Sequence, residues 1–362
     1  QKVSYNIVGN KQENNKQENN KQENNKHENN KQVDKIQENK MQENNIYLSP
    51  APHFSQKRKS WQIMLLVIIS LLPECIAGVY YFGLSALITI LVSVTSCILF
   101  EGLFQKAIKT PVQIKDLSAV VTGILLALTL PSTTPIWMTI LGAFFAIVIT
   151  KGFFGGIGCN IWNPALSGRA FLLISFPVAL GSSWAAPLTD AVSTATPLAN
   201  ISNYVNQFAS KNDCYWNLFI GNHAGSIGET CILAILISGI FLLATKVIDW
   251  RAPLMMILTC SIFTFLTGDD VIITLLSGGL LFGAFFMVTD YTTAPVTKPG
   301  RYVFGFGCGL ITFLIRKFGG YPEGVMFSIL IMNSLVPFLN KLSKRKYGYN
   351  LKKQSAKKGE KV

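Results

Sequence analysis

The chain has 362 residues, of which 49% are hydrophobic and only 14% charged, and its formal net charge is +13. An average soluble domain carries about 25% charged residues, so this composition excludes a soluble globular enzyme. The basic excess lies at the two ends: residues 1–59 hold 11 Lys/Arg and 7 Asp/Glu, residues 341–362 hold 9 and 1, and the residues between them hold 12 and 11. A nearly neutral middle also excludes a nucleic-acid-binding core, and what is left is a membrane protein that crosses the bilayer several times.

The first predicted region is a polar tail, residues 1–59. The pentapeptide KQENN occurs at 11–15, 16–20 and 21–25, and KHENN follows at 26–30. Such a segment has too few apolar side chains to form a core, so we expect it to be disordered. The membrane domain is predicted at 60–340, and a basic C-terminal tail at 341–362.

Ten apolar segments follow one another from Trp61. A spanning helix needs about 20 predominantly apolar residues, and tilted or broken helices deviate from this length. The fold class predicted is therefore an all-α integral membrane protein with about ten transmembrane helices. The predicted spans are 61–80, 83–104, 115–130, 136–150, 164–180, 228–246, 253–268, 271–289, 302–318 and 324–340.

Glycine and proline interrupt several of these spans, around Pro131–Pro135, Gly152–Gly158 and Thr289–Pro299. Irregular backbone at membrane depth is tolerated where it is buried in protein or lines a cavity, so these breaks are expected to form the functional interior. In addition, the Gly152–Gly158 stretch could be taken for a phosphate-binding loop, but a dinucleotide fingerprint follows a strand. A helix break or close helix packing is the favoured interpretation.

Lys and Arg near the ends of the spans predict the orientation. They precede the first span at Lys57–Lys59, mark the loop after the second span at Lys106 and Lys109, and recur at alternate loops, including Lys151. This pattern predicts that both termini are cytoplasmic and that the long loop 181–227 lies outside. Arg316 and Lys317 are the exception, because counting the spans from the N-terminus places these two residues on the outer face.

An internal repeat accounts for that exception. Gly123 precedes Thr133-Thr134-Pro135 much as Gly279 precedes Thr292-Thr293-Ala294-Pro295, and KGFFGG from Lys151 resembles RKFGG from Arg316. Spans 1–5 and 6–10 would then be two inverted five-helix repeats with broken helices, an arrangement that recurs in transporters.

The outer loop contains the strongest local signal, the sequence DAVSTATP from Asp190 to Pro197. From the residues alone it is a Ser/Thr-rich turn or helix start with Asp or Ser as cap. The pattern D-x-x-S/T-x-A-T, however, resembles the flavinylation sequence that FMN transferases recognise.

Four further stretches resemble the D subunit of the Rnf ion-translocating oxidoreductase complex, which is related to the B subunit of the sodium-translocating NADH:quinone oxidoreductase. The resemblance covers roughly residues 61–340 and leaves the tails unmatched. The stretches are LALTLPSTTPIW (126–137), KGFFGGIGCNIWNPALSGRAFLLISFP (151–177), GGLLFGAFFMVTDYTTAPVTKPGR (278–301) and GYPEGVMFSILIMNSLVP (320–337).

The resemblance implies FMN bound covalently through its phosphate to the hydroxyl of Thr196, with Asp190 recognised by the transferase. Ser193 and Thr194 belong to the same motif and are poorer candidates for the attachment. A second, noncovalent flavin such as riboflavin is also implied, and Asn160, Trp162 and Asn163 are the candidates for its pocket. Anchoring at the membrane interface is an equally good interpretation of Trp162.

By the same resemblance, the chain is one subunit of a complex in the cell membrane that transfers electrons between ferredoxin and NAD and couples this to Na⁺ or H⁺ translocation. The implied partners are the other Rnf subunits (A, B, C, E and G), above all the flavin-bearing G subunit, the FMN transferase and membrane lipid. No catalytic residue is assigned, since the flavins carry the redox chemistry. The alternative is a redox-free secondary transporter or channel with inverted repeats.

Ionisable groups inside spans are rare and are functional candidates by default. Glu74 lies well inside the first span after Pro73, so a carboxylate there is the candidate for the ion path. Arg169 and Arg301 follow polar turns; they could contact a flavin or a partner, but helix-end anchoring is favoured. The three His are assigned no role. Solvated positions near span ends are favoured for seven acids: Glu101, Asp116, Glu229, Asp269, Asp270, Asp290 and Glu323.

The seven cysteines contain no C-x-x-C pair. Their scatter gives neither a zinc site nor an iron–sulfur motif, so no metal site is predicted, and the cysteines are interpreted as small hydrophobic residues.

Overall fold

The computed structural model describes residues 59–110, 114–181, 210–319 and 324–342, together with 184–185, 187, 193–194, 198, 204–206 and 208. The repeats of the N-terminal tail and nearly all of the basic C-terminal tail lie outside these residues. The described chain is helical apart from one pair of two-residue strands, and the predicted all-α character is confirmed.

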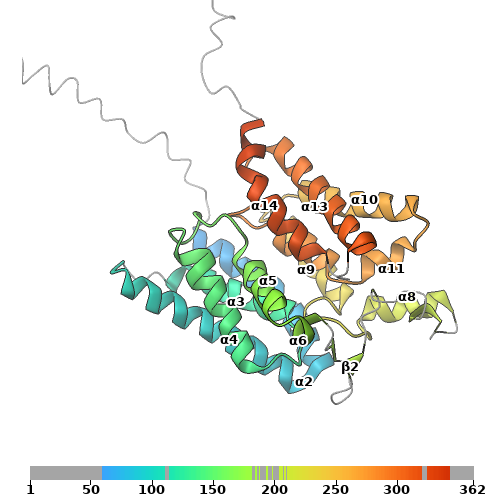
Figure 1. Ribbon diagram of the computed structural model, residues 1–362, viewed down its shortest axis with the longest axis horizontal. Helices are drawn as coiled ribbons and strands as arrows, with labels where there is room; N and C mark the ends of the chain where they lie inside the picture. Colours follow the sequence, from blue (N-terminus) through green and yellow to red (C-terminus); the bar gives the residue numbers. More distant parts are fainter. Residues whose placement is uncertain are drawn as a thin grey trace, which may run out of the picture. The chain divides into compact units, whose positions relative to one another are not determined.

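The elements follow in chain order, and Figure 1 labels most of them. The first group is α2 (Ser60–Ala107), η1 (Ile114–Asp116), α3 (Ser118–Thr129), α4 (Ile136–Phe144), η2 (Phe145–Gly152), α5 (Pro164–Ser175) and α6 (Pro177–Gly181). Next come β1 (Trp184–Ala185), β2 (Ser193–Thr194) and α8 (Lys211–Ile220). The last group is α9 (Ile232–Ala244), α10 (Arg251–Leu266), α11 (Val271–Leu276), α12 (Leu280–Phe282), η3 (Gly283–Met287), α13 (Lys298–Phe318) and α14 (Val325–Leu342).

The long helix α2 is two helices joined at Gly83. Its 48 residues would extend about 72 Å at 1.5 Å per residue, far more than a bilayer core of about 30 Å. Gly83 has φ 67° and ψ −147°, a backbone conformation that only glycine adopts readily. The break falls between the two spans predicted at 61–80 and 83–104. Among the described residues, α2 is the one helix that is both long and apolar enough to cross a membrane, with mean hydropathy 2.2 over its most apolar window.

Each of the ten predicted apolar segments contains helix, and two of them are divided by breaks that the sequence analysis did not name. The span at 164–180 is divided at Phe176, because Pro177 cannot continue the hydrogen-bonding of α5. The span at 271–289 is divided at Ser277–Gly279, where Gly278 and Gly279 have φ of 71° and 64°. The breaks predicted around Pro131–Pro135, Gly152–Gly158 and Thr289–Pro299 all contain non-helical backbone.

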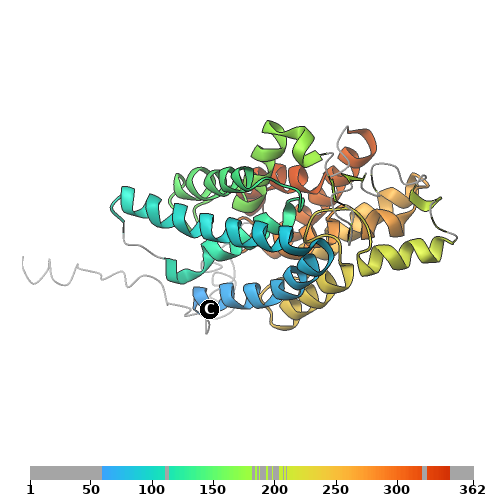
Figure 2. The same ribbon diagram turned by 90° about the horizontal axis from the view of Figure 1, so that it is seen from below.

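Small residues let the helices of the first half approach closely. A Cβ on Gly123 of α3 would lie 2.7 Å from the Cα of Val94 in α2, a distance that real Cβ atoms do not tolerate. The Ser93 hydroxyl donates a 2.7 Å hydrogen bond to the Gly123 carbonyl across the same contact. Close backbone approach at a small residue is the usual way in which membrane helices gain packing energy. The blue N-terminal part of α2 also lies beside α9 (Figure 2).

Residues 221–231, at the end of the predicted outer loop, turn into the interior of the protein. This segment joins α8 to α9, and its residues from His223 to Thr230 are buried. The backbone N–H of Ile227 donates to the Leu130 carbonyl at 3.1 Å, and that of Gly228 donates to the Leu128 carbonyl at 2.7 Å. These bonds satisfy carbonyl groups at the C-terminal end of α3, which lack partners within the helix.

The described part of the predicted outer loop also contains α8 and the strand pair. Tyr215 of α8 donates a 2.6 Å hydrogen bond to Asp270, the N-cap residue of α11, and so fixes α8 to the helical domain. This hydrogen bond, together with partial burial, raises the pKa of Tyr215 to about 12. Asp270 is therefore held by two helices, which corrects the prediction that it is merely solvated.

Candidate functional site

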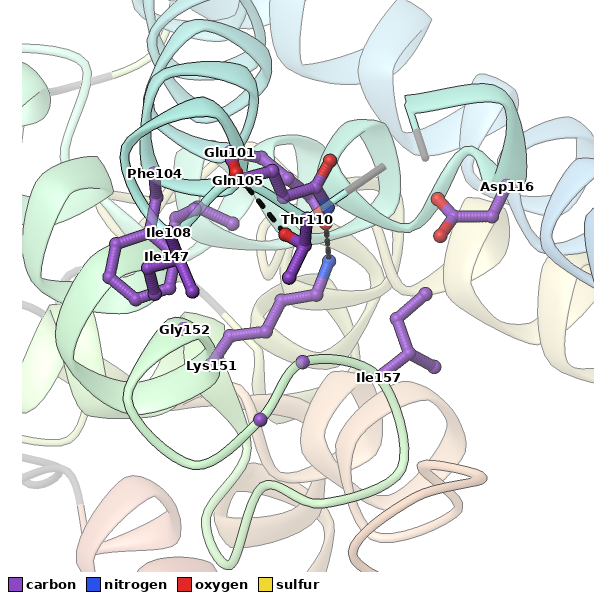
Figure 3. A pocket seen from close by; sticks show the side chains of 12 residues that line it. Glu101, Phe104, Gln105, Ile108, Thr110, Asp116, Ile147, Lys151, Gly152 and Ile157 are labelled. Atoms are coloured by element: carbon purple, nitrogen blue, oxygen red, sulfur yellow. Dashed lines mark hydrogen bonds and ion pairs between the residues drawn. The ribbon is translucent and has the colours of Figure 1, made fainter. Parts of the chain in front are cut away.

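A buried cation lies where η2 meets the end of α2. The Lys151 ammonium group is 2.6 Å from Glu101 Oε1 and 2.6 Å from Ser118 Oγ, and Lys151 and Glu101 are each about 4% exposed. In Figure 3 the Lys151 side chain extends toward Glu101. Two sequence predictions are thereby corrected: Lys151 is not a charge in a surface loop, and Glu101 is not solvated. Each group is buried because the other compensates its charge.

Ser118 extends this cluster to a second carboxylate. Its hydroxyl accepts from Lys151 and donates to Asp116 Oδ1 at 2.9 Å, and its backbone N–H also donates to Asp116 at 3.0 Å. Asp116 is half-buried and ends the turn before α3. The four side chains therefore form one hydrogen-bonded series, Glu101–Lys151–Ser118–Asp116.

A cavity of about 360 Å³ lies against this series (Figure 3). Phe104, Ile108 and Ile147 form an apolar wall, and Glu101, Asp116 and Lys151 supply the charge. The volume lies within the range of small-molecule sites, and an apolar cavity with a few convergent polar groups is their usual make-up.

The glycine-rich stretch after η2 closes one side of the cavity. Gly155, Gly156 and Gly158 have φ of 104°, 90° and 87°, and the turn is tied by bonds from the N–H of Gly155 to the Gly152 carbonyl and from the N–H of Gly156 to the Lys151 carbonyl. A side chain on Gly152 would collide with the Phe104 ring at 2.6 Å. The interpretation as a helix break with close packing is confirmed.

A second cavity of about 70 Å³ adjoins the first, since Lys151 and Ile157 line both. Two of the three residues predicted for the noncovalent flavin, Asn160 and Asn163, line this smaller cavity. Asn160 donates to Thr292 Oγ1 at 3.1 Å. Trp162 is not among the lining residues of either cavity.

Trp162 packs elsewhere in the same loop. Its indole N–H donates to Ser334 Oγ of α14 at 2.7 Å, and its ring meets the edge of Phe154. The structure therefore assigns Trp162 a role in docking the loop on α14.

Asp290 organises the far wall of the smaller cavity. Its Oδ2 accepts from Asn163 at 3.4 Å, Thr292 at 3.1 Å and Thr293 at 2.9 Å, so the prediction of simple solvation was wrong. Burial raises the pKa of the Asp290 carboxyl group, and the hydrogen bonds from Thr293 and Thr292 oppose that shift. Asn163 also caps α5 by accepting from the Leu166 N–H, so one asparagine orients both the helix and the carboxylate.

The flavinylation motif is described only in part. Thr196 and Asp190 lie outside the described residues. The backbone of Ser193 and Thr194 forms β2, which pairs antiparallel with Trp184 and Ala185 of β1. The structure therefore leaves the attachment at Thr196 a prediction.

A third cavity, also about 70 Å³, lies at the end of α13 and is lined by Leu198 and Arg316. Arg316 donates to the carbonyls of Thr274, Ser277 and Gly278, where α11 breaks. Guanidinium donors suit carbonyl groups that have lost their helical partners, so Arg316 stabilises this break.

Glu74 and Glu229 are both buried, at 1% and 3% exposure. Glu229 accepts from the Ser226 N–H at 3.1 Å, which corrects the prediction that it is solvated. Neither carboxylate oxygen of Glu74 has a hydrogen-bond partner among the described residues. His223, in the segment before Glu229, is buried as well, and burial lowers its pKa to about 4.

Other predicted residues have structural positions. Arg301, in the first turn of α13, contacts Asp249 at 2.5 Å and the Pro295 carbonyl at 2.9 Å, which confirms helix-end anchoring. Burial raises the pKa of Asp249, but its bonds from Arg251 and Arg301 outweigh burial and hold the pKa below its usual value.

Arg169 is half-buried in α5. Lys317 pairs with Asp269 at 2.6 Å, both partly exposed. Glu323 lies outside the described residues.

Four of the seven cysteines are buried as predicted for small hydrophobic residues, but Cys159 is exposed. Within the part of the chain that the structure describes, no group of three or more His, Cys, Asp or Glu residues is arranged to hold a metal ion.

The Glu101–Lys151–Ser118 cluster is the feature that sequence reasoning missed. A signal for it was present: Lys151 directly follows an apolar run, and Glu101 lies within another. The rule that ionisable groups inside spans have partners applies to both residues and would have paired them.

Comparison with known proteins identifies a family and similar relatives. The family model described as NQR2, RnfD, RnfE family matches residues 47–348. The chain is 44% identical to the D subunit of the Na⁺-translocating ferredoxin:NAD⁺ oxidoreductase complex of Acetobacterium woodii over 315 residues, which is 86% of this chain and 98% of the relative. It is 39% identical to the D subunit of the proton-translocating ferredoxin:NAD⁺ oxidoreductase complex of Clostridium ljungdahlii, covering 83% and 95%. It is 35% identical to the D subunit of the ion-translocating oxidoreductase complex of Escherichia coli O127:H6, covering 83% and 98%.

Proposed function

We propose that this chain, which belongs to the NQR2, RnfD, RnfE family, is the D subunit of an ion-translocating ferredoxin:NAD⁺ oxidoreductase complex in the cell membrane. Similarity to two D subunits of ferredoxin:NAD⁺ oxidoreductase complexes supports the proposal, since the chain covers at least 95% of each. Residues 60–340 would form the membrane domain with ten spans, arranged as two inverted repeats of five. Broken helices at Ser277–Gly279 and after η2 suit such an arrangement.

Within that complex, the chain would transfer electrons through FMN attached to Thr196. The sequence of the motif from Asp190 to Thr196 supports this attachment, and a covalent bond would keep the cofactor at an exposed site through every turnover. The flavin supplies electron transfer, and the chain supplies its position. The flavin-bearing G subunit is the proposed partner in electron transfer, and an FMN transferase the partner in maturation.

Flavin fluorescence tests the attachment. The full chain, expressed with an FMN transferase, should give a fluorescent band after denaturing electrophoresis. Thr196→Val should abolish the band, because valine has no hydroxyl group to esterify, whereas the matched variant Thr194→Val should keep it. A dark wild-type band would instead favour the redox-free transporter or channel.

The two adjoining cavities are the proposed site of a noncovalent flavin such as riboflavin. Phe104, Ile108 and Ile147 offer apolar surface to a flat ring, while Lys151 offers a hydrogen-bond donor at the ring's edge and the Asn160 amide oxygen an acceptor. An ammonium group has three N–H donors, and the structure commits two of those of Lys151, to Glu101 and Ser118. The residues present thus fit the chemistry of a flavin.

Ile157 is the residue at which this site can be blocked. It is partly exposed and lines both cavities, so Ile157→Trp should fill them at little cost to the fold. We expect the noncovalent flavin released from the purified Thr196→Val complex by acid to fall roughly tenfold or more in this variant, as expected when a ring fills the cavity. Ile161→Trp is the matched control, because Ile161 is equally exposed in the same loop and lines neither cavity. Equal flavin content in both variants would place the noncovalent flavin elsewhere.

A further inference from the structure

Glu74 is an acid buried without a partner in the interior of α2. It is 1% exposed, and neither an ion pair nor a hydrogen bond reaches its carboxyl group among the described residues. The buried residues one turn away on the same face are Ser70, Leu71 and Gly78, none of which is charged, and the Ser70 hydroxyl donates to the Val67 carbonyl. An ionised carboxylate in such a setting is disfavoured, so the neutral acid is the form that this environment accommodates.

The helix is weakened directly beside this carboxyl group. Pro73 has no N–H to donate to the Ile69 carbonyl, and a proline inside a helix kinks or loosens it at that turn. One turn later, Gly78 lies against Ile227: a Cβ on Gly78 would be 2.5 Å from Ile227 Cγ2. Glu74 thus lies between a weak point of α2 and the buried segment 221–231, where the backbone can shift more readily than in a regular helix.

The surroundings of Glu74 distinguish between the two ions that the relatives are named for. Sodium is held in transporters by several oxygen atoms, typically carbonyls of unwound backbone together with side chains. Ser238 of α9 is the polar side chain that interacts with Glu74 from another helix. Its hydroxyl group, however, forms no hydrogen bond of acceptable geometry with the Glu74 carboxyl group. Cys75, the neighbour on α2, also interacts with it electrostatically. A sodium site needs several such oxygen atoms, whereas a carboxyl group alone suffices to bind a proton.

We propose that Glu74 is a proton-binding site of the ion path and that the ion bound there is H⁺. Resting on the proposed function, the inference adds the identity of the ion at one residue. In the step, the Glu74 carboxylate takes one proton from water on one side to give the neutral acid, and releases that proton to the other side when the surroundings of Glu74 become hydrated. No electron moves at Glu74 itself.

Labelling with dicyclohexylcarbodiimide tests the site in membranes containing the assembled complex. This apolar reagent reacts with protonated carboxyl groups in apolar surroundings: the acid adds across its N=C bond, and the adduct rearranges to a stable N-acylurea with nothing released. Mass spectrometry should find the adduct on Glu74 and less of it as the pH is raised. Sodium chloride should protect Glu74 from labelling no better than choline chloride does at equal ionic strength.

Two variants complete the test. Glu74→Gln removes the acid and keeps the size of the side chain. The variant should form no adduct at residue 74, and the number of protons translocated per electron should fall by at least about tenfold. Its covalent flavin band should be unchanged, so failure of the inference is distinguishable from failure of the proposed function. Glu101→Gln should keep the adduct on Glu74. An unlabelled Glu74, selective protection by sodium, or unimpaired proton translocation in Glu74→Gln would each overturn the proposal.

Discussion

The Lys151 ammonium group is enclosed by helices and depends on two oxygen atoms, Glu101 Oε1 and Ser118 Oγ. Breaking a buried ion pair by removing one partner is far more costly than removing both, because the remaining charge stays buried without compensation. Comparing the stability of single and double variants therefore shows whether the two residues stabilise the protein as a pair or as two independent charges.

Lys151→Met should therefore lower the free energy of unfolding by about 3–5 kcal/mol, the usual loss when one member of a buried pair is removed. The double variant Lys151→Met with Glu101→Leu should recover most of this loss, since neither charge of the pair is then left in the interior. Thermal unfolding of the purified chain in detergent measures both. An equal loss in the single and double variants would show that the two residues act separately.

Among the helices, α2 and α3 make a close backbone contact at Gly123. Alanine usually stabilises a helix relative to glycine by about 0.5–1 kcal/mol, so its effect at an open helical position is favourable. At Gly123 the new methyl group would meet the backbone of Val94, which cannot move without separating the two helices. Replacing glycine by alanine should thus destabilise the protein at a crowded position and stabilise it at an open one.

Gly123→Ala is expected to destabilise the chain by about 1–3 kcal/mol, the range for overpacked cores. Gly181→Ala is the matched control at the end of α6, where the nearest atom to a new Cβ is a Leu173 methyl group at 3.7 Å. It should leave the melting temperature unchanged or raise it. If both variants melt at the wild-type temperature, the contact between α2 and α3 is looser than the structure shows.

The helices themselves could be predicted because apolar length and Gly or Pro breaks are local properties of the sequence. Gly83 and Pro177 end helices for reasons that are visible in the residues themselves. The break at Ser277–Gly279 was missed, because a Gly-Gly pair within an apolar run is also compatible with tight helix packing. It is Arg316, nearly forty residues away, that satisfies the carbonyls opened there.

The candidate site shows the same division. The motif around Thr196 and the asparagines of the Asn160–Asn163 loop were recognisable from sequence, because each set lies within a few consecutive residues. The pairing of Lys151 with Glu101 joins residues fifty positions apart, and only the general rule that charges inside spans have partners could have found it. The hydrogen bond of Trp162 to Ser334 of α14 is equally invisible in the sequence, because the two residues are far apart in the chain.

For the molecule as a whole, the burial of Lys151 changes the argument for orientation. A buried, paired lysine does not report which side of a membrane a loop faces, so this loop no longer contributes to the charge count. The prediction that both termini are cytoplasmic now depends on the residues flanking the first span, the loop after the second span, the later alternate loops with Lys246, Arg251, Lys298 and Arg301, and the basic tail.

Cys159 provides a natural test of that orientation. It is exposed in the loop between η2 and α5, which the predicted topology places on the cytoplasmic side. An impermeant maleimide should label it in inside-out vesicles and not in intact cells, and Cys159→Ser should remove that signal. Trp216→Cys on the exposed face of α8 should show the opposite pattern. Labelling of Cys159 from outside would reverse the topology.

The segment 221–231 has a consequence for how the chain is made. Its backbone N–H groups at Ile227 and Gly228 complete the C-terminal end of α3, which was synthesised about one hundred residues earlier. Until that segment leaves the ribosome, the carbonyls of Leu128 and Leu130 lack these donors, and buried carbonyls without donors are costly in an apolar setting. The helices on the N-terminal side of α8 therefore cannot reach their final packing while translation is still upstream of residue 228. Biogenesis of this membrane domain is a single event that ends late, and the nascent first half is the intermediate that the insertion machinery must protect.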